Sequence, residues 1–201
     1  MEHCNASITP AEPRLQLSKN EDEQDVDLIQ YRRLIGSLRY LCNTRPNLAF
    51  SVGIMSKFMG RPKVYHLEAF KRIPRYVKGF VDCRILFLIE DMGRKCNFIS
   101  FIGSNSYKYK DDRKSTTGYI FMFGGTPISW CSKKEPVVAL SSCEVEYIVT
   151  SLCLCQAAWL TNPLKELGSS EDEAVKLLVD NVSVINLAKN PITHGGANIL
   201  R

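Results

Sequence analysis

The hydrophobic pattern of this 201-residue chain changes near residue 93, and this change constrains the fold more than any other feature. Before it, apolar residues recur at helical spacing, as between residues 28 and 41. After it, short β-prone runs are separated by turn residues, as in residues 116–123, which precede Gly124-Gly125. The pattern predicts a helical part followed by a part that is built on a sheet.

The first part is expected to hold three helices, over residues 28–41, 48–59 and 63–78. Asp27 is placed to cap the first of them, and residues 1–26 are polar and are interpreted as a loop or tail. Pro74 lies inside the third helix. An interior proline removes a helical hydrogen bond at a cost of roughly 3 kcal/mol, so this helix is expected to kink or end there.

The second part is expected to hold strands over residues 97–102, 116–123, 127–132 and 175–179, and helices over residues 141–167 and 182–189. Gly124-Gly125 is a hairpin signal, and Ser141 with Glu144 forms a capping-box pattern. Pro163 again lies inside a helix. The order β-β-β-α-β-α predicts an α/β fold, in α+β form, with helices packed on a mixed sheet. The core of this part is expected to include Trp130, Trp159 and the pair Phe121 and Phe123.

The net charge of +5 hides a basic segment. Residues 28–80 hold 11 basic residues and one acidic residue, Glu68. Such a segment with interleaved aromatic residues suits contacts with nucleic-acid phosphates and bases, and the alternative is a solvated helical surface. The candidate nucleic-acid-binding residues are Arg32, Arg33, Arg39, Arg45, Lys71, Arg72, Arg75 and Lys78.

Several classes of protein are disfavoured by the composition. No apolar run approaches the roughly 20 residues that span a bilayer. The first residues lack the pattern of a secretory signal. The eight cysteines form no CxxC pair, which argues against a zinc site. Scattered cysteines of this kind are expected to be reduced and mostly buried thiols. We therefore expect an intracellular protein of the cytoplasm or nucleus that does not contact membranes.

Two acidic residues stand where a sheet could bring them together. Glu146 lies in the first turns of the predicted long helix, and Asp180 follows the last predicted strand. Carboxylates from separate elements suit Mg²⁺, which prefers oxygen ligands, and metal ions can assist phosphodiester cleavage. The alternatives are a glutamate that compensates the helix dipole and an Asp-Asn turn.

Five stretches make the chain resemble the C-terminal part of a copia-type LTR retrotransposon Pol polyprotein. They are YRRLIGSLRYLCNTRPNLAFSV (31–52), HLEAFKRIPRYVKG (66–79), DDRKSTTGYIFMFGG (111–125), ISWCSKKEPVVALSSCEVEYI (128–148) and LLVDNVSVINLAKNP (177–191). The resemblance implies a polar leader (1–26), a thumb or connection segment of the reverse transcriptase (27–95) and an RNase H-like domain (96–201). It also implies that the polymerase palm is absent, so that no polymerase activity is expected.

The resemblance assigns metal-binding carboxylates to Glu146 and Asp180, which hold Mg²⁺ for cleavage of RNA in RNA–DNA hybrids. Relatives carry a first catalytic Asp where Gly103 stands here, and they often carry another Asp at the nearby position that Asn105 occupies in this chain. A fourth acid is expected near the end, but the chain reads HGGANILR up to Arg201, as in a C-terminally truncated domain. Mg²⁺ binding and nuclease activity are therefore expected to be impaired.

Four hypotheses follow from these residues. The chain is a degenerate RNase H-like fragment with little activity, or it is a residual Mg²⁺-dependent nuclease. Alternatively it is a non-catalytic module that binds an RNA–DNA hybrid or other nucleic acid, or an unstable product with no molecular role. A separately supplied reverse-transcriptase palm is a further candidate partner.

Overall fold

Two hydrophobic cores organise the chain in the computed structural model, which describes residues 4–12, 17, 23–83, 85–86, 98–105, 114–135, 138–139, 141–167 and 175–189. The described residues up to Ile85 belong to one unit, and those from Leu86 onward belong to a second. The predicted boundary between residues 95 and 96 lies outside the described residues. Among the described helices, none is both long and apolar enough to cross a membrane.

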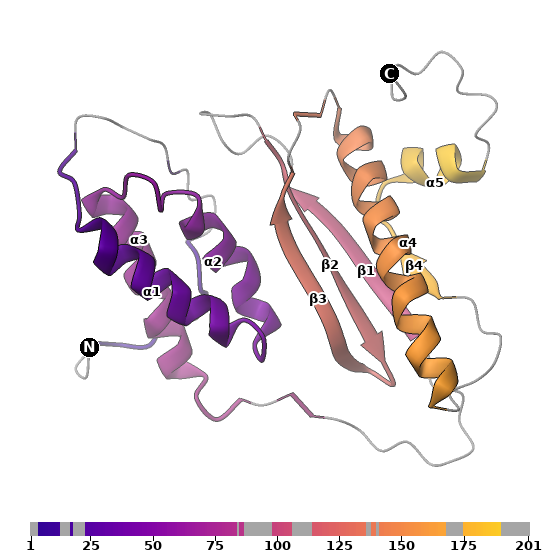
Figure 1. Ribbon diagram of the computed structural model, residues 1–201, viewed down its shortest axis with the longest axis horizontal. Helices are drawn as coiled ribbons and strands as arrows, with labels where there is room; N and C mark the ends of the chain where they lie inside the picture. The colour runs from indigo at the N-terminus through magenta and orange to yellow at the C-terminus, as the bar shows by residue number, and fades with distance from the viewer. Residues whose placement is uncertain are drawn as a thin grey trace. The chain divides into compact units, whose positions relative to one another are not determined.

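The first unit contains α1 (Leu28–Leu41), the 3-10 helix η1 (Pro46–Leu48), α2 (Ala49–Ser56) and α3 (Val64–Gly79). Figure 1 labels the three α-helices. The three predicted helices are thus confirmed. The Asp27 carboxylate begins α1 by accepting hydrogen bonds from the backbone N–H groups of Ile29 (2.8 Å) and Gln30 (3.3 Å), as predicted for an N-cap. The core is formed by side chains from all three helices, among them Tyr31, Ile35, Val52, Met55, Phe70 and Ile73.

Helix α3 continues through Pro74 to Gly79, so it does not end at the proline. Ile73 and Tyr76, on either side of Pro74, are buried in the core of the first unit. Burial of large apolar side chains offsets the hydrogen bond that the proline removes. Helix α4 of the second unit passes through Pro163 in the same way.

The second unit contains β1 (Phe98–Asn105), β2 (Thr116–Phe123), β3 (Thr126–Lys134), α4 (Ser142–Glu166), β4 (Lys176–Leu178) and α5 (Val182–Lys189). The predicted element order is confirmed. The strands form one sheet in the order β3-β2-β1-β4. The β1–β2 and β2–β3 pairs are antiparallel, and β4 is parallel to β1. This mixed sheet with its helices confirms the predicted fold class and agrees with an RNase H-like fold.

The β2–β3 hairpin turns at Gly124 and Gly125, as the sequence predicts. Their φ angles are 55° and 77°, in the left-handed region that favours glycine. Positive φ angles at both central residues are typical of the turn that matches the twist of a hairpin.

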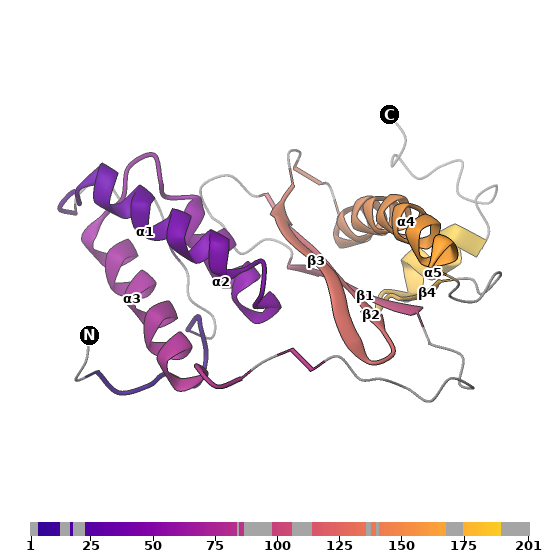
Figure 2. The ribbon, with the colours of Figure 1, turned by 60° about the horizontal axis from the view of Figure 1, so that its bottom comes forward.

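Helix α4 lies along one face of the sheet, as Figures 1 and 2 show from two sides. Val145, Val149, Cys153 and Ala157 recur every four residues on the buried side of the helix. They pack with Ile102 of β1 and Phe121 of β2, which form the centre of the second core. Trp159 is 65% exposed, so the prediction that it belongs to the core is wrong. It lies two residues beyond Ala157, and about 200° of helical rotation turns it away from the sheet.

The proline in α3 leads to a prediction about stability. Replacing Pro74 by Leu restores the missing N–H and removes the ring's clash with the preceding turn, so the free energy of unfolding should rise by about 1–3 kcal/mol. The greater freedom of the unfolded variant reduces this gain. Urea denaturation of both proteins measures it, and a less stable variant would contradict the prediction.

Candidate functional site

Glu146 is placed by the way in which α4 begins. The Ser141 hydroxyl accepts a hydrogen bond from the backbone N–H of Glu144 at 3.1 Å, which confirms Ser141 as the N-cap. The helix then buries Val145 and Val149 against the sheet. Glu146 therefore lies in the second turn, at the border between the packed and the solvated side of α4.

The two carboxylate oxygens of Glu146 have different surroundings. The Ser104 hydroxyl of β1 donates a hydrogen bond to Oε1 at 3.3 Å. Oε2 is buried, and no hydrogen bond of regular geometry reaches it. A buried acceptor without a partner carries a desolvation cost, which a bound cation would relieve.

Asp180 and Asn181 approach this carboxylate from the end of β4. Asn181 begins α5, because its Oδ1 accepts a hydrogen bond from the backbone N–H of Ser183 at 2.9 Å. Burial raises the pKa of Glu146, and the negative charge of Asp180 raises it further. Hydrogen bonds from the side chains of Asn181 and Ser104 lower the pKa of Glu146. The structure thus brings the two predicted acidic residues into electrostatic contact.

Gly103 supplies no carboxylate to this group. The face of β1 that contacts α4 carries Ser100, Ile102 and Ser104. Because side chains alternate between the two faces of a strand, a side chain at residue 103 would point to the opposite face. A Cβ added at Gly103 would meet no atom within 4 Å. Ser104 is therefore the β1 residue beside Glu146, and the sequence analysis missed it because a serine next to a glycine carries no chemical signal.

The oxygen atoms at this site suit one hard cation. Two carboxylates, a hydroxyl and an amide are donors of the kind that Mg²⁺ accepts, and it completes its shell with water. Glu146 Oε2 is the buried, unpartnered atom that such an ion would satisfy. Among the described residues, no three His, Cys, Asp or Glu side chains gather closely enough to hold a metal ion. Residues 106–113, with Asp111 and Asp112, lie outside the described residues.

The cysteines within the described ranges form no metal-binding arrangement either. The seven cysteines in the described residues are free thiols, and Cys96 lies outside them. The expectation that most thiols are buried is wrong for these seven, because three are exposed and three are partly exposed. Cys153 is buried, and its sulfur lies 3.1 Å from the Ser100 hydroxyl.

In the first unit, most candidate nucleic-acid-binding residues hold the unit together. Arg32 donates to the carbonyl of Met59 at 3.1 Å, and Arg39 donates to the Ser56 hydroxyl at 3.2 Å. Arg45 donates to the carbonyls of Phe80 (2.7 Å) and Val81 (3.2 Å), just beyond α3. These side chains tie the helices to one another, so their number alone does not indicate a nucleic-acid surface.

Three more basic residues bind the segment formed by residues 4–9, which we call the leader strap. Arg72 donates to the Thr9 carbonyl (3.1 Å) and hydroxyl (3.0 Å). Arg75 donates to the carbonyl of Asn5 at 2.9 Å, and Lys78 donates to that of Cys4 at 3.2 Å. The interpretation of this segment as a loop is correct in that it contains no helix or strand. It is not a free tail, since it runs along α3.

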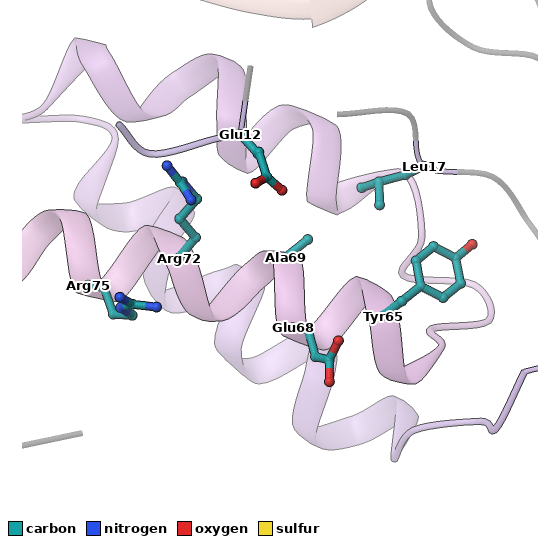
Figure 3. Close-up of a pocket in the computed structure, with 7 residues that line it drawn as sticks. All are labelled: Glu12, Leu17, Tyr65, Glu68, Ala69, Arg72 and Arg75. Atoms are coloured by element: carbon teal, nitrogen blue, oxygen red, sulfur yellow. The ribbon is translucent and has the colours of Figure 1, made fainter. Parts of the chain in front are cut away.

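A pocket of about 360 Å³ lies between the leader and α3 (Figure 3). Its lining combines the basic Arg72 and Arg75 with the acidic Glu12 and Glu68. The mixed charge does not favour a polyanion there. Of the eight candidate residues, Arg33 and Lys71 are exposed, and their side chains make no hydrogen bond that the described part of the structure shows.

Comparison with curated proteins gives consistent matches. The chain is 37% identical over 186 residues to the Retrovirus-related Pol polyprotein from transposon RE1 of Arabidopsis thaliana, covering 92% of this chain and 12% of that protein. It is 35% identical over 201 residues to the corresponding protein from transposon TNT 1-94 of Nicotiana tabacum, covering 96% of this chain and 15% of the relative. A third match is the protein from transposon RE2 of Arabidopsis thaliana, at 34% identity over 92% of this chain and 13% of that protein.

These matches define the class of protein. The chain belongs to the retrovirus-related Pol polyproteins of copia-type transposons, and it corresponds to a fragment of such a protein. It spans about an eighth of the length of these relatives. No protein-family model matches the chain, and no solved structure matches it significantly.

The raised pKa of Glu146 predicts a pH dependence of stability. Because the folded pKa lies above the unfolded value, the folded state binds the extra proton between these two values. Lowering the pH from 7 through this window should therefore stabilise the wild type relative to Glu146→Gln. Solvent screening keeps the effect below about 1 kcal/mol. Urea denaturation with a chelator at pH 7 and pH 5 measures it, and a shift in favour of the Gln variant would contradict the sign.

Arg72 and Lys71 are neighbours on α3, but we expect their side chains to contribute differently to the free energy of unfolding. Arg72→Gln removes charged hydrogen bonds to the leader strap and should lower the free energy of unfolding by about 1–2 kcal/mol. Lys71→Gln should leave stability unchanged within about 0.5 kcal/mol, because Lys71 is exposed. Denaturation curves of the two variants provide the test, and equal losses would contradict the structural role of Arg72.

Proposed function

We propose that the second unit is an RNase H-like domain that retains part of a divalent-cation site and hydrolyses RNA–DNA hybrids weakly or not at all. The observation that carries this proposal is the convergence of Glu146 and Asp180 from α4 and the end of β4, with Glu146 Oε2 buried and unpartnered. The relationship to Pol polyproteins supports a role on nucleic acid. The missing carboxylate on β1 supports reduced activity.

The reaction concerned is phosphodiester hydrolysis. A water oxygen bonds to phosphorus, the P–O3′ bond breaks, and the proton that water loses ends on the 3′ oxygen. A bound Mg²⁺ supplies activation of water and stabilisation of the leaving oxygen. In this chain Glu146 and Asp180 would hold the ion, and the Asn181 side chain hydrogen-bonds to the Glu146 carboxylate.

A second candidate function is nucleic-acid binding without cleavage. It is favoured by Arg33 and Lys71, which are exposed on the first unit. Binding through such side chains weakens steeply with salt, and the loss of one phosphate contact lowers the salt slope by about one. Titration of a labelled hybrid at several salt concentrations, with wild type and Lys71→Gln, measures this contribution.

Hybrid cleavage with Mg²⁺ tests the main proposal. The resemblance places the missing carboxylate at residue 103, and the geometry places residue 104 beside Glu146. We therefore compare Gly103→Asp with Gly103→Ala, and Ser104→Asp with Ser104→Ala. A carboxylate at the productive position should raise cleavage at least about tenfold over its Ala control, because it stabilises charge in the transition state.

Asp180→Asn, introduced into the active variant, should abolish the gain. No gain from either Asp substitution would contradict the proposal that the β1 carboxylate is what the site lacks. Efficient cleavage by the wild type would contradict the impairment. A protease-sensitive product without cooperative unfolding would instead favour a chain with no molecular role.

A further inference from the structure

The side chains of β1 that face α4 form a short polar and apolar series. Ser100 lies against Cys153, Ile102 packs in the core, and Ser104 reaches Glu146. Each position faces a different turn of α4, because the helix runs along the strand. Only Ser104 in this series lies at the level of the two acidic residues.

Because of the hydrogen bond from Ser104, the two carboxylate oxygens of Glu146 differ in their interactions. Oε1 accepts a hydrogen bond from the Ser104 hydroxyl, with the two oxygen atoms 3.3 Å apart. Oε2 is buried, and no hydrogen bond of regular geometry reaches it. A glutamate side chain has three rotatable bonds, and ordering it costs up to about 2 kcal/mol in lost rotamer freedom. Because the Ser104 hydroxyl already holds Glu146 Oε1, part of this rotamer freedom is lost before a ligand binds, and the entropy cost of binding is smaller.

We propose that Ser104 is a positioning residue of the cation site, which holds Oε1 of Glu146 so that Oε2 is presented to a divalent cation beside Asp180. This inference rests on the proposed function, since it concerns the same ion. It goes beyond that function because it assigns a role on β1 to a residue that carries no charge. Outer hydrogen bonds of this kind orient metal ligands, and their loss typically weakens metal binding at least tenfold.

Mn²⁺ binding to the full chain tests the role of Ser104. Mn²⁺ is a paramagnetic probe of magnesium sites, and isothermal titration with electron paramagnetic resonance measures its affinity without any substrate. Ser104→Ala should weaken binding about tenfold, and Ser104→Thr, which keeps the hydroxyl, should restore it to within about twofold of wild type. Ser100→Ala is the matched control, because it removes a hydroxyl from the same face of the same strand without touching Glu146.

The outcomes separate the two proposals. If Glu146→Gln and Asp180→Asn weaken binding but Ser104→Ala does not, the role of Ser104 is overturned and the cation site stands. If none of the three substitutions changes Mn²⁺ binding, both are overturned. Loss of binding in Ser104→Thr as well as in Ser104→Ala, with unchanged melting temperatures, would also contradict a role for the hydroxyl.

Discussion

The packing of α4 on the sheet is the constraint on which the candidate site depends. Four side chains at four-residue spacing, Val145, Val149, Cys153 and Ala157, fix both the rotation of the helix and its height along β1. This rotation places Glu146 beside Ser104, which donates a hydrogen bond to its carboxylate. It also brings Glu146 near enough to Asp180 for the negative charge of Asp180 to raise the pKa of Glu146. The candidate site is therefore a consequence of core packing, and a chain that keeps this core keeps the geometry of the acidic pair.

The first unit shows why a count of basic residues is a poor measure of nucleic-acid binding. Its arginines donate to carbonyls beyond helix ends and to the leader strap, where a charged donor satisfies backbone groups that have no helical partner. Lys63 follows the same principle: it is buried, it lies 2.9 Å from Asp25, and it donates to the carbonyl of Glu23 at 2.7 Å. Positive charge in this segment therefore stabilises the fold as well as giving the surface its charge.

Local signals predicted the elements well because their causes are local. The Asp27 cap, the Gly124-Gly125 turn and the Ser141 cap each depend on a few neighbouring residues. Long-range packing could not be predicted in the same way: α3 and α4 pass through Pro74 and Pro163, and Trp159 faces solvent. At the site, the sequence indicated Glu146 and Asp180 by type and position. The contact with Ser104 depends on the register between β1 and α4, which no sequence pattern states.

We predict a single divalent-cation site formed by residues of β1, α4 and the end of β4. A Mg²⁺ titration followed by amide NMR is the most direct test. Saturable shifts should be confined to the amides of residues 103–105, 145–147 and 180–182, with the helical first unit unaffected. Such a pattern would place the ion between α4, β1 and the end of β4, where Glu146 Oε2 is unpartnered. Shifts that are absent, that do not saturate, or that spread over both units would contradict the claim that this fragment retains an ordered cation site.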